Sequence, residues 1–541
     1  MTCQAQLDLS STPLPQPIDR NIYGHFLESA FYGNIEGGVL DEGSPLAVAD
    51  DGPLQGCRAD VLEACAELGV PVLRWPGGNF TSPYWWRDGT GPRDRRPRRL
   101  ELAWGSEESN RFGTPEFLAW ADAVGAEPYL AHSCRDVDDA VRWVEYTNYR
   151  GTTEMARLRA EDGHPEPYGV RYWGLGNEVY GPWQMGHRPV GRYVEDAREH
   201  ARFMRAVDPS LSFVAVGWDR EEWTDAVVAG LGEVADYVSV HHYGASLHLV
   251  DPSVAEFEAV VGQSLFFERA LVSYSQLVAE AAERHGVGRP PAIAMDEWNM
   301  RHLEPASWPE PQPGADGGVA PRELTEPGEE TPRRVNRHSP RTLADALFYA
   351  GVFHAMHRTA QLPVPVAMAN TVNLVNANGL LNVRPEGLVR TTTYFVWDLY
   401  QNHFGTRPTA VGLRAPSRWA QARLSDERRL RGELLTAPTT VPDLDVSAAL
   451  SEDGSRLTVA VINRSPDTDL TTQLTLDGRT DRLPGTVEVR TLGADADDLF
   501  AVNTIDDPGR VTLSPARTVE LDQARMTFGA HSITLLTFDL R

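Results

Sequence analysis

The sequence contains no lysine, so all 50 of its basic side chains are arginines. This absence excludes every mechanism that forms a Schiff base on lysine. Cysteine is also scarce: there are four residues and no Cys-x-x-Cys pair, which argues against a structural zinc site or a dithiol redox centre. We therefore expect no bound metal.

Long apolar runs are missing as well. The N-terminal segment has neither a charged start nor an apolar stretch, and no run along the chain is long enough to span a bilayer. The formal net charge is −26 and the pI is about 5.0, so the surface repels nucleic acid and anionic lipid. We expect a cytoplasmic protein that has neither nucleic acid nor a membrane as a partner.

At 541 residues the chain exceeds one ordinary domain. Eight apolar runs of strand length alternate with helix-like segments, and most are continuously apolar, as parallel strands covered on both faces are. This order predicts a (β/α)8 TIM barrel over residues 18–385. A doubly wound open sheet is the alternative, but it needs no particular number of strands, and the glycine-rich phosphate loop of many such folds is absent. The runs are Asn21–Phe26, Pro71–Trp75, Pro128–His132, Arg171–Asn177, Ser212–Trp218, Tyr237–Tyr243, Ala292–Trp298 and Val364–Val372.

The sequence pattern changes after about residue 400, where short segments alternate apolar and polar residues. Asp445–Leu450 and Arg456–Ile462 flank the turn sequence Ser-Glu-Asp-Gly-Ser, which indicates a β-hairpin. We assign residues 386–541 to a C-terminal all-β sandwich domain. Residues 304–340 are rich in Pro, Gly and Glu without periodicity, so we expect a long loop that is either a tolerated insertion or a lid.

Two glutamates each end a strand-like run, and they are the most informative feature of the chain. Glu178 ends the fourth run, and Glu297 lies at the end of the seventh. The carboxyl ends of barrel strands are where barrel enzymes hold their catalytic groups. A pair of carboxylates at this edge is the arrangement that cleavage of a glycosidic bond requires.

Polar and aromatic side chains end the other runs, as a sugar site requires. Arg74 has a purely structural alternative, holding a nearby carboxylate ionised. His241 has another, as a core histidine with satisfied hydrogen bonds. Gly77-Gly78 alone is weak evidence for a phosphate loop, and a tight turn that lets Asn79 enter the pocket explains it. The candidate substrate-binding residues are Glu28, Arg74, Asn79, Trp104, Asn177, His241, Tyr243 and Asn373.

Taken together, these motifs resemble the α-L-arabinofuranosidases of glycoside hydrolase family 51. The resemblance spans most of the barrel, and the combination is specific, although Gly-Asn-Glu alone is shared by many barrel glycosidases. It is carried by Ile22–Glu28, Leu73–Phe80, Leu102–Trp104, Gly176–Glu178, Gly181–His187, His241–Tyr243 and Asp296–Asn299.

The resemblance implies roles for several residues. Glu178 matches the acid/base and Glu297 the nucleophile, while Glu28, Asn79, Asn177 and Tyr243 match positions that hold the furanose or orient the nucleophile. It also implies a jelly-roll-like β domain that includes residues 1–17, no cofactor, and a homo-oligomer (a hexamer or trimer).

Three positions depart from the family pattern: Asn373 replaces Gln, Arg301 replaces an aromatic residue, and His242 replaces Gln. The expected activity is retaining, exo-acting release of terminal α-L-arabinofuranosyl residues from a furanoside-containing oligosaccharide. One alternative is the same chemistry on another furanose, such as β-D-galactofuranose. A more remote one is a sugar-binding protein without catalysis.

Overall fold

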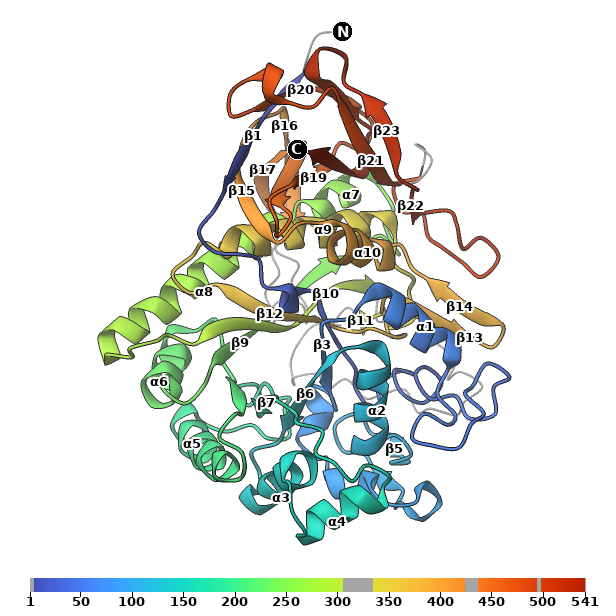
Figure 1. Cartoon of the computed structure of the whole chain (residues 1–541), viewed down its shortest axis with the longest axis vertical. Coiled ribbons are helices and arrows are strands. Elements are labelled where there is room, and N and C mark those ends of the chain that lie inside the picture. The colour runs from blue at the N-terminus through green and yellow to red at the C-terminus, as the bar shows by residue number, and fades with distance from the viewer. Residues whose placement is uncertain (1–3, 305–333, 424–435, 494–497, 541) are drawn as a thin grey trace.

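The computed structural model describes residues 4–304, 334–423, 436–493 and 498–540, and Figure 1 shows their arrangement. A closed barrel of parallel strands forms because β9 pairs with both β8 and β10. Each of the eight predicted runs supplies one strand, which confirms the (β/α)8 barrel. The strands are β2 (Gly24–Phe26), β3 (Val72–Trp75), β6 (Glu127–His132), β7 (Tyr172–Leu175), β8 (Ser212–Ala215), β9 (Tyr237–Ser246), β10 (Ala292–Glu304) and β12 (Val366–Thr371).

Helices connect these strands and cover the outer face of the barrel (Figure 1). Along the described ranges, no helix is both long and apolar enough to cross a lipid bilayer. The α-helices are α1 (Ala59–Leu68), α2 (Thr114–Val124), α3 (Val137–Asn148), α4 (Glu154–Glu161), α5 (Val190–Val207), α6 (Glu221–Leu231), α7 (Val254–Val261), α8 (Ser264–His285), α9 (Leu343–Thr359) and α10 (Tyr394–His403). Short 3-10 helices are η1 (Arg20–Tyr23), η2 (Asn79–Thr81), η3 (Trp86–Gly89), η4 (Arg93–Arg95), η5 (Thr480–Arg482) and η6 (Asp522–Ala524).

The C-terminal part is all-β, as predicted, and is built on one ten-stranded mixed sheet that encloses its own apolar core. β1 (Ala5–Pro13) lies in the middle of this sheet, antiparallel to β15 and parallel to β20. The N-terminal segment therefore completes a sheet whose other strands come from the end of the chain. Those strands are β15 (Arg407–Arg414), β18 (Leu444–Leu450), β19 (Arg456–Asn463), β20 (Leu470–Leu476), β21 (Thr486–Gly493), β22 (Thr512–Leu513), β23 (Arg517–Glu520), β24 (Arg525–Phe528) and β25 (Ser532–Asp539).

Short pairs of strands are added to both the barrel and the β domain. β16 and β17 form an antiparallel arm beside α7, where Arg418 pairs with Glu258 at 3.1 Å. β11 pairs with the outer end of β10. Most of the long loop predicted over 304–340, residues 305–333, lies outside the described residues. The remaining strands are β4 (Arg99–Leu100), β5 (Glu107–Glu108), β11 (Arg334–Val335), β13 (Leu381–Arg384), β14 (Gly387–Arg390), β16 (Ser417–Arg423) and β17 (Thr436–Pro442).

Helix α10 corrects one expectation from the sequence. It lies within 386–541, the segment assigned to the β domain, yet it packs on the barrel. Trp397 is fully buried and stacks on Trp298 of β10 with ring centroids 5.7 Å apart. Its indole N–H also donates to the backbone oxygen of Tyr23 at 3.1 Å. The apolar periodicity of this helix is too short to reveal from sequence which neighbour it covers.

Helix α9 joins the two parts of the molecule. It lies between the barrel and the mixed sheet (Figure 1), and nearly all of its residues are buried. His357 makes a hydrogen bond on each side: one to the Tyr23 hydroxyl at 2.8 Å and one to Ser447 Oγ of β18 at 2.8 Å. The sequence of a helix that is buried on every face is mostly apolar on all sides.

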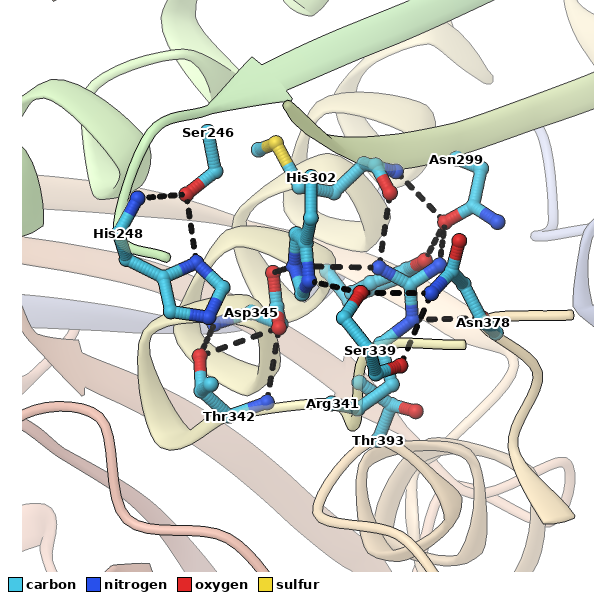
Figure 2. A network of polar contacts seen from close by, with 12 residues as sticks. Ser246, His248, Asn299, His302, Ser339, Arg341, Thr342, Asp345, Asn378 and Thr393 are labelled. Carbon is cyan, nitrogen blue, oxygen red and sulfur yellow. Dashed lines mark hydrogen bonds and ion pairs between the residues drawn. The ribbon is translucent and has the colours of Figure 1, made fainter. Parts of the chain in front are cut away.

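A network of buried polar groups ties the outer end of β10 to α9 (Figure 2). Arg341, which precedes the helix, is its centre. Its guanidinium donates to the backbone oxygens of Met300 at 2.8 Å and Asn378 at 2.6 Å, and to Asn299 Oδ1 at 2.5 Å. The strand that carries Glu297 is thereby held two and three residues beyond the glutamate.

His302 extends the same network (Figure 2). Its Nε2 lies 2.9 Å from Asp345 Oδ1, and its Nδ1 lies 2.7 Å from Ser339 Oγ. Asp345 caps α9 by accepting from the Thr342 backbone N–H at 2.8 Å. Burial lowers the pKa of His302 and outweighs the opposing charge of Asp345, so the imidazole is neutral at neutral pH. It then donates to Asp345 and accepts from Ser339.

His302 should make folding sensitive to acid. The unfolded imidazole takes up a proton near pH 6.5, whereas the folded one resists it. Its contribution to stability is therefore present above pH 6.5 and is lost as the pH falls below that value, by up to about 1.4 kcal/mol per pH unit. We expect His302→Gln to be less stable than the parent at pH 8, with a smaller gap at pH 5. Urea midpoints followed by tryptophan fluorescence measure both gaps.

The matched control is His187→Gln, because His187 is exposed. This variant should track the parent at both pH values. A His302→Gln gap that is equal at pH 8 and pH 5 would contradict the neutral state assigned to the buried imidazole.

Candidate active site

Glu178 and Glu297 face each other across the carboxyl end of the barrel. Glu178 follows β7, Glu297 belongs to β10, and each is about 6% exposed. One carboxylate oxygen of each glutamate and a ring nitrogen of His241 all lie within 4.8 Å of one another. This spacing is close to the roughly 5–5.5 Å of retaining glycosidases and well short of the roughly 6.5–9.5 Å of inverting ones.

An irregularity in β10 brings two consecutive carboxylates to the interior. The register of β10 against β9 shifts between Ala294 and Glu297, as it does against β12. Strict alternation would turn Asp296 and Glu297 to opposite faces, and a bulge removes that restriction. Both side chains consequently reach Arg74.

Arg74, the third residue of β3, is a buried guanidinium that fixes this edge of the site. It donates to Glu297 Oε1 at 2.8 Å, to Asn177 Oδ1 at 2.5 Å and to the backbone oxygen of Asp296 at 3.0 Å. Burial opposes its charge, but Asp296 and Glu297 outweigh burial and raise the pKa of Arg74. The structural role for Arg74 is what the contacts show, and it holds Glu297 in one orientation.

The second oxygen of Glu297 is also hydrogen-bonded. Tyr243 of β9 donates its hydroxyl to Oε2 at 2.7 Å. A Cβ at position 78 would lie 2.7 Å from Oε1, and one at position 77 would lie 2.6 Å from Glu28 Cγ. The glycine pair therefore allows the carboxylates of Glu297 and Glu28 to approach the loop after β3 closely.

Glu178 occupies a strained backbone position, with φ of 41° in the left-handed region. Its Oε2 accepts from the Trp183 indole at 2.6 Å, and its Oε1 lies 2.8 Å from His241 Nδ1. Burial raises the pKa of Glu178, but the hydrogen bond and charge of His241, followed by Trp183, outweigh it and lower the pKa. Glu178 is thus ionised while His241 carries a proton.

His241 of β9 lies among three carboxylates. Its Nδ1 is 3.5 Å from Glu297 Oε2, and its Nε2 is 3.2 Å from Asp296 Oδ1, in addition to the contact with Glu178. Burial lowers the pKa of His241, but the three acids outweigh burial and raise it well above its usual value. Both ring nitrogens of His241 therefore lie close to carboxylates, those of Glu178, Asp296 and Glu297.

Glu28, which follows β2, contacts the loop after β3. Its Oε1 accepts from the Trp104 indole at 3.0 Å and from the backbone N–H groups of Phe80 at 3.0 Å and Gly78 at 3.2 Å. Burial raises the pKa of Glu28 to about 8, although the Phe80 N–H opposes this change. Glu28 and Trp104, both among the candidate substrate-binding residues, are therefore in direct contact.

Two other predicted residues lie nearby without joining these contacts. Asn79 stands between Gly78 and Phe80, and its backbone oxygen accepts from Gln184 at 3.5 Å. Asn373 follows β12 and donates to the Ala377 backbone oxygen at 3.2 Å. Within the described ranges its buried Oδ1 has no hydrogen-bond partner.

Sequence reasoning missed two residues that the structure brings to the site. Trp183 was quoted in a motif but not proposed as a site residue, and its position five residues after Glu178 in one loop was the available signal. Asp296 belongs to the motif Asp296–Asn299 but is not among the candidate site residues, yet it contacts both Arg74 and His241. Its orientation depends on the β10 bulge, and no sequence signal marks that bulge.

Glu178, His241 and Glu297 also carry atoms of the kinds that bind metal ions. In the described part of the chain, they are the group of such residues whose ligand atoms lie within 4.8 Å of one another. A histidine whose pKa is raised presents a proton rather than a lone pair, and Arg74 already adds a positive charge 2.8 Å from Glu297. The donor set therefore favours a proton at this position, and we assign no metal to it.

Comparison with known proteins identifies the family. Residues 64–258 match the model of the alpha-L-arabinofuranosidase 1 domain, and residues 296–532 match that of the alpha-L-arabinofuranosidase C-terminal domain. The chain is 34% identical to alpha-L-arabinofuranosidase C of Emericella nidulans, over 96% of this chain and 94% of that protein. It is 32% identical to the intracellular exo-alpha-(1->5)-L-arabinofuranosidase of Streptomyces lividans, over 94% of this chain and 71% of that protein.

A solved structure agrees with these relatives. The alpha-L-arabinofuranosidase of Thermotoga maritima, determined as an arabinose complex, superposes with a TM-score of 0.80 at 33% identity and covers 99% of this chain and 100% of that one. The matches include both the barrel and the β domain. The chain therefore belongs to the α-L-arabinofuranosidases of glycoside hydrolase family 51, the family that its strand-end motifs indicated.

Proposed function

We propose that the protein is a retaining, exo-acting α-L-arabinofuranosidase that uses Glu297 as nucleophile and Glu178 as acid/base. The observation that carries this proposal is the pair of buried carboxylates, with oxygens within 4.8 Å, held by different partners. Family membership supplies the substrate class: terminal α-L-arabinofuranosyl residues of an oligosaccharide. Two carboxylates in different environments divide into two roles.

Glu297 is prepared for attack on the anomeric carbon. Arg74 and Tyr243 each bind one of its oxygens, so its orientation is fixed before substrate arrives. In the first step an oxygen of Glu297 forms a bond to the anomeric carbon, the glycosidic C–O bond breaks, and Glu178 protonates the departing oxygen. The negative charge of Glu297 disappears as the glycosyl ester forms.

The proton for this step is held by the Glu178–His241 pair. In the free enzyme it lies on His241, one hydrogen bond of 2.8 Å from Glu178 Oε1. Transfer along this hydrogen bond gives the neutral carboxyl group that general acid catalysis needs, and the two groups titrate as a unit. In the second step Glu178 accepts a proton from water as that water attacks the anomeric carbon and the ester bond breaks.

The walls around the pair supply hydroxyl-binding groups for the furanose. The Oδ1 of Asn373 is a buried acceptor whose partner we assign to a sugar hydroxyl, and protonated Glu28 offers a donor. Arg74, His241 and Tyr243 act on the carboxylates rather than on the sugar. The remaining groups that we assign to the sugar are Asn79, Trp104 and Asn177.

We also propose a cytoplasmic location and a homo-oligomer, a hexamer or trimer. The Streptomyces lividans relative that is named intracellular supports the first. The family resemblance and the exposed Trp419, 74% exposed on β16, support the second. Light scattering on the purified chain measures the mass, and a monomer at micromolar concentration would refute the oligomer.

Stereochemistry tests the mechanism directly. Proton NMR of the first product from an aryl α-L-arabinofuranoside should show the α anomer, because two displacements at one carbon retain configuration. The β anomer as the first product would exclude the double displacement. No turnover of any arabinofuranoside would exclude the proposed function.

Substitution separates the two carboxylates. Glu297→Gln should lower kcat by roughly four orders of magnitude or more on every substrate, since no nucleophile remains. Glu178→Ala should lose about 10²–10⁴-fold on substrates with poor leaving groups and much less on the dinitrophenyl arabinofuranoside, whose leaving group needs no proton. Azide should accelerate turnover by Glu178→Ala alone, giving an α-glycosyl azide. Equal losses on both substrates without azide rescue would reverse or reject the assignment.

Asn373 should shape the outer part of the furanose pocket. Its amide is one methylene shorter than glutamine, so Asn373→Gln should fill space that an exocyclic group of a larger furanose needs. We expect kcat/KM on a β-D-galactofuranoside to fall about tenfold more than on an α-L-arabinofuranoside, the discrimination that one methylene gives. Asn402→Gln on the exposed side of α10 is the control. An unchanged ratio would remove Asn373 from the specificity determinants.

A further inference from the structure

Arg301 lies beyond the catalytic pair, on the way out of the site. It belongs to β10, four residues after Glu297, and is paired in register with Ala245 of β9. A strand rises about 3.3 Å per residue, so the backbone of Arg301 lies ~13 Å farther along β10 than that of Glu297, toward the C-terminal end of the strand. In an exo-acting pocket the glycone fills the deep end, and the leaving group points to the mouth.

The side chain of Arg301 turns back toward the site. Its Cζ lies 3.6 Å from the centroid of the Tyr243 ring, and the hydroxyl of this tyrosine donates to Glu297. This distance is that of a cation–π contact, in which the positive charge of the guanidinium is attracted to the face of the ring. Arg301 is partly exposed, so solvent reaches the side chain from the mouth.

The charge of Arg301 acts on the acid side of the site. After burial, His241 and Trp183, Arg301 is the next contributor to the pKa of Glu178, which it lowers. It also opposes the rise that burial and Glu297 cause in the pKa of Tyr243. The guanidinium therefore lies within electrostatic reach of the carboxyl that protonates the leaving group.

We propose that Arg301 binds a carboxylate on the leaving group, so that the favoured substrates are α-L-arabinofuranosyl residues attached to a saccharide containing uronic acid. This inference rests on the proposed function and adds the chemical class of the aglycone. In a chain with net charge −26 an acidic aglycone is repelled at long range, and a fixed guanidinium at the mouth provides the local attraction it needs. Guanidinium and carboxylate match in planar, two-point geometry.

A matched pair of substrates tests the proposal. The first is a disaccharide of α-L-arabinofuranose and a hexuronic acid, and the second is the same disaccharide with its carboxylate converted to the amide. The parent should hydrolyse the acid with a kcat/KM about tenfold above that of the amide at low salt, the effect of one hydrogen bond to a charged group. Arg301→Gln should bring the ratio close to one, and Arg301→Lys should retain part of it. Because the acid and the amide are compared within each enzyme, an effect of the substitution on the hydrolysis of both substrates cancels in the ratio of their kcat/KM values.

Two controls keep the outcome clear. Arg482→Gln, an exposed residue of the β domain, should preserve the parent ratio. Sodium chloride at 0.5 M should shrink the ratio of the parent without any substitution, because screening weakens an exposed ion pair. A parent ratio of one, or the same ratio in the parent and Arg301→Gln, would overturn the proposal while 4-nitrophenyl α-L-arabinofuranoside is still hydrolysed. Failure on that neutral substrate would instead overturn the proposed function.

Discussion

The buried guanidinium of Arg74 is the interaction on which the rest of the site depends. It contacts Glu297 and Asp296 of β10 and Asn177 of the β7 loop, so it joins three sectors of the barrel. Without it, the adjacent buried carboxylates of Asp296 and Glu297 would lose their guanidinium partner, and removing one partner of a buried ion pair costs roughly 3–5 kcal/mol. Because the guanidinium cannot lose its proton, its positive charge faces Glu297 at every pH at which the protein folds.

The strand that carries Glu297, the proposed nucleophile, is held on both sides of this residue. A bulge before Glu297 turns Asp296 and Glu297 together into the barrel, and Arg341 fixes Asn299 and Met300 just beyond. Catalytic groups must be kept within a fraction of an ångström of their working positions. Rigid strands achieve this, and the network in Figure 2 anchors β10 just beyond Glu297.

How much of the fold and of the site was predictable depends on whether each feature is set by neighbouring residues in the sequence or by contacts in the tertiary structure. The eight barrel strands and both glutamates were predictable, because burial of apolar runs and strand ends are local properties. The inward turn of Asp296 was not, since a one-residue register shift depends on the neighbouring strands. The packing of α10 on the barrel was not predicted for the same reason. Trp397 could pack on the barrel or on the β domain, and only the tertiary fold determines which of the two it contacts. Asn373 was placed near the sugar, but its hydrogen bond to Ala377 depends on the path of its loop.

Because the chain contains no lysine, the cations in this site are arginines and a histidine. Three cations face the catalytic carboxylates: Arg74 beneath Glu297, Arg301 over Tyr243, and His241 between the two glutamates. Two are guanidiniums, whose charge is constant, and they set a fixed background potential. Of the three, His241 is the one whose proton can be transferred, because the guanidiniums stay charged. In the proposed mechanism, the proton that Glu178 delivers to the leaving group is therefore the one that it shares with His241.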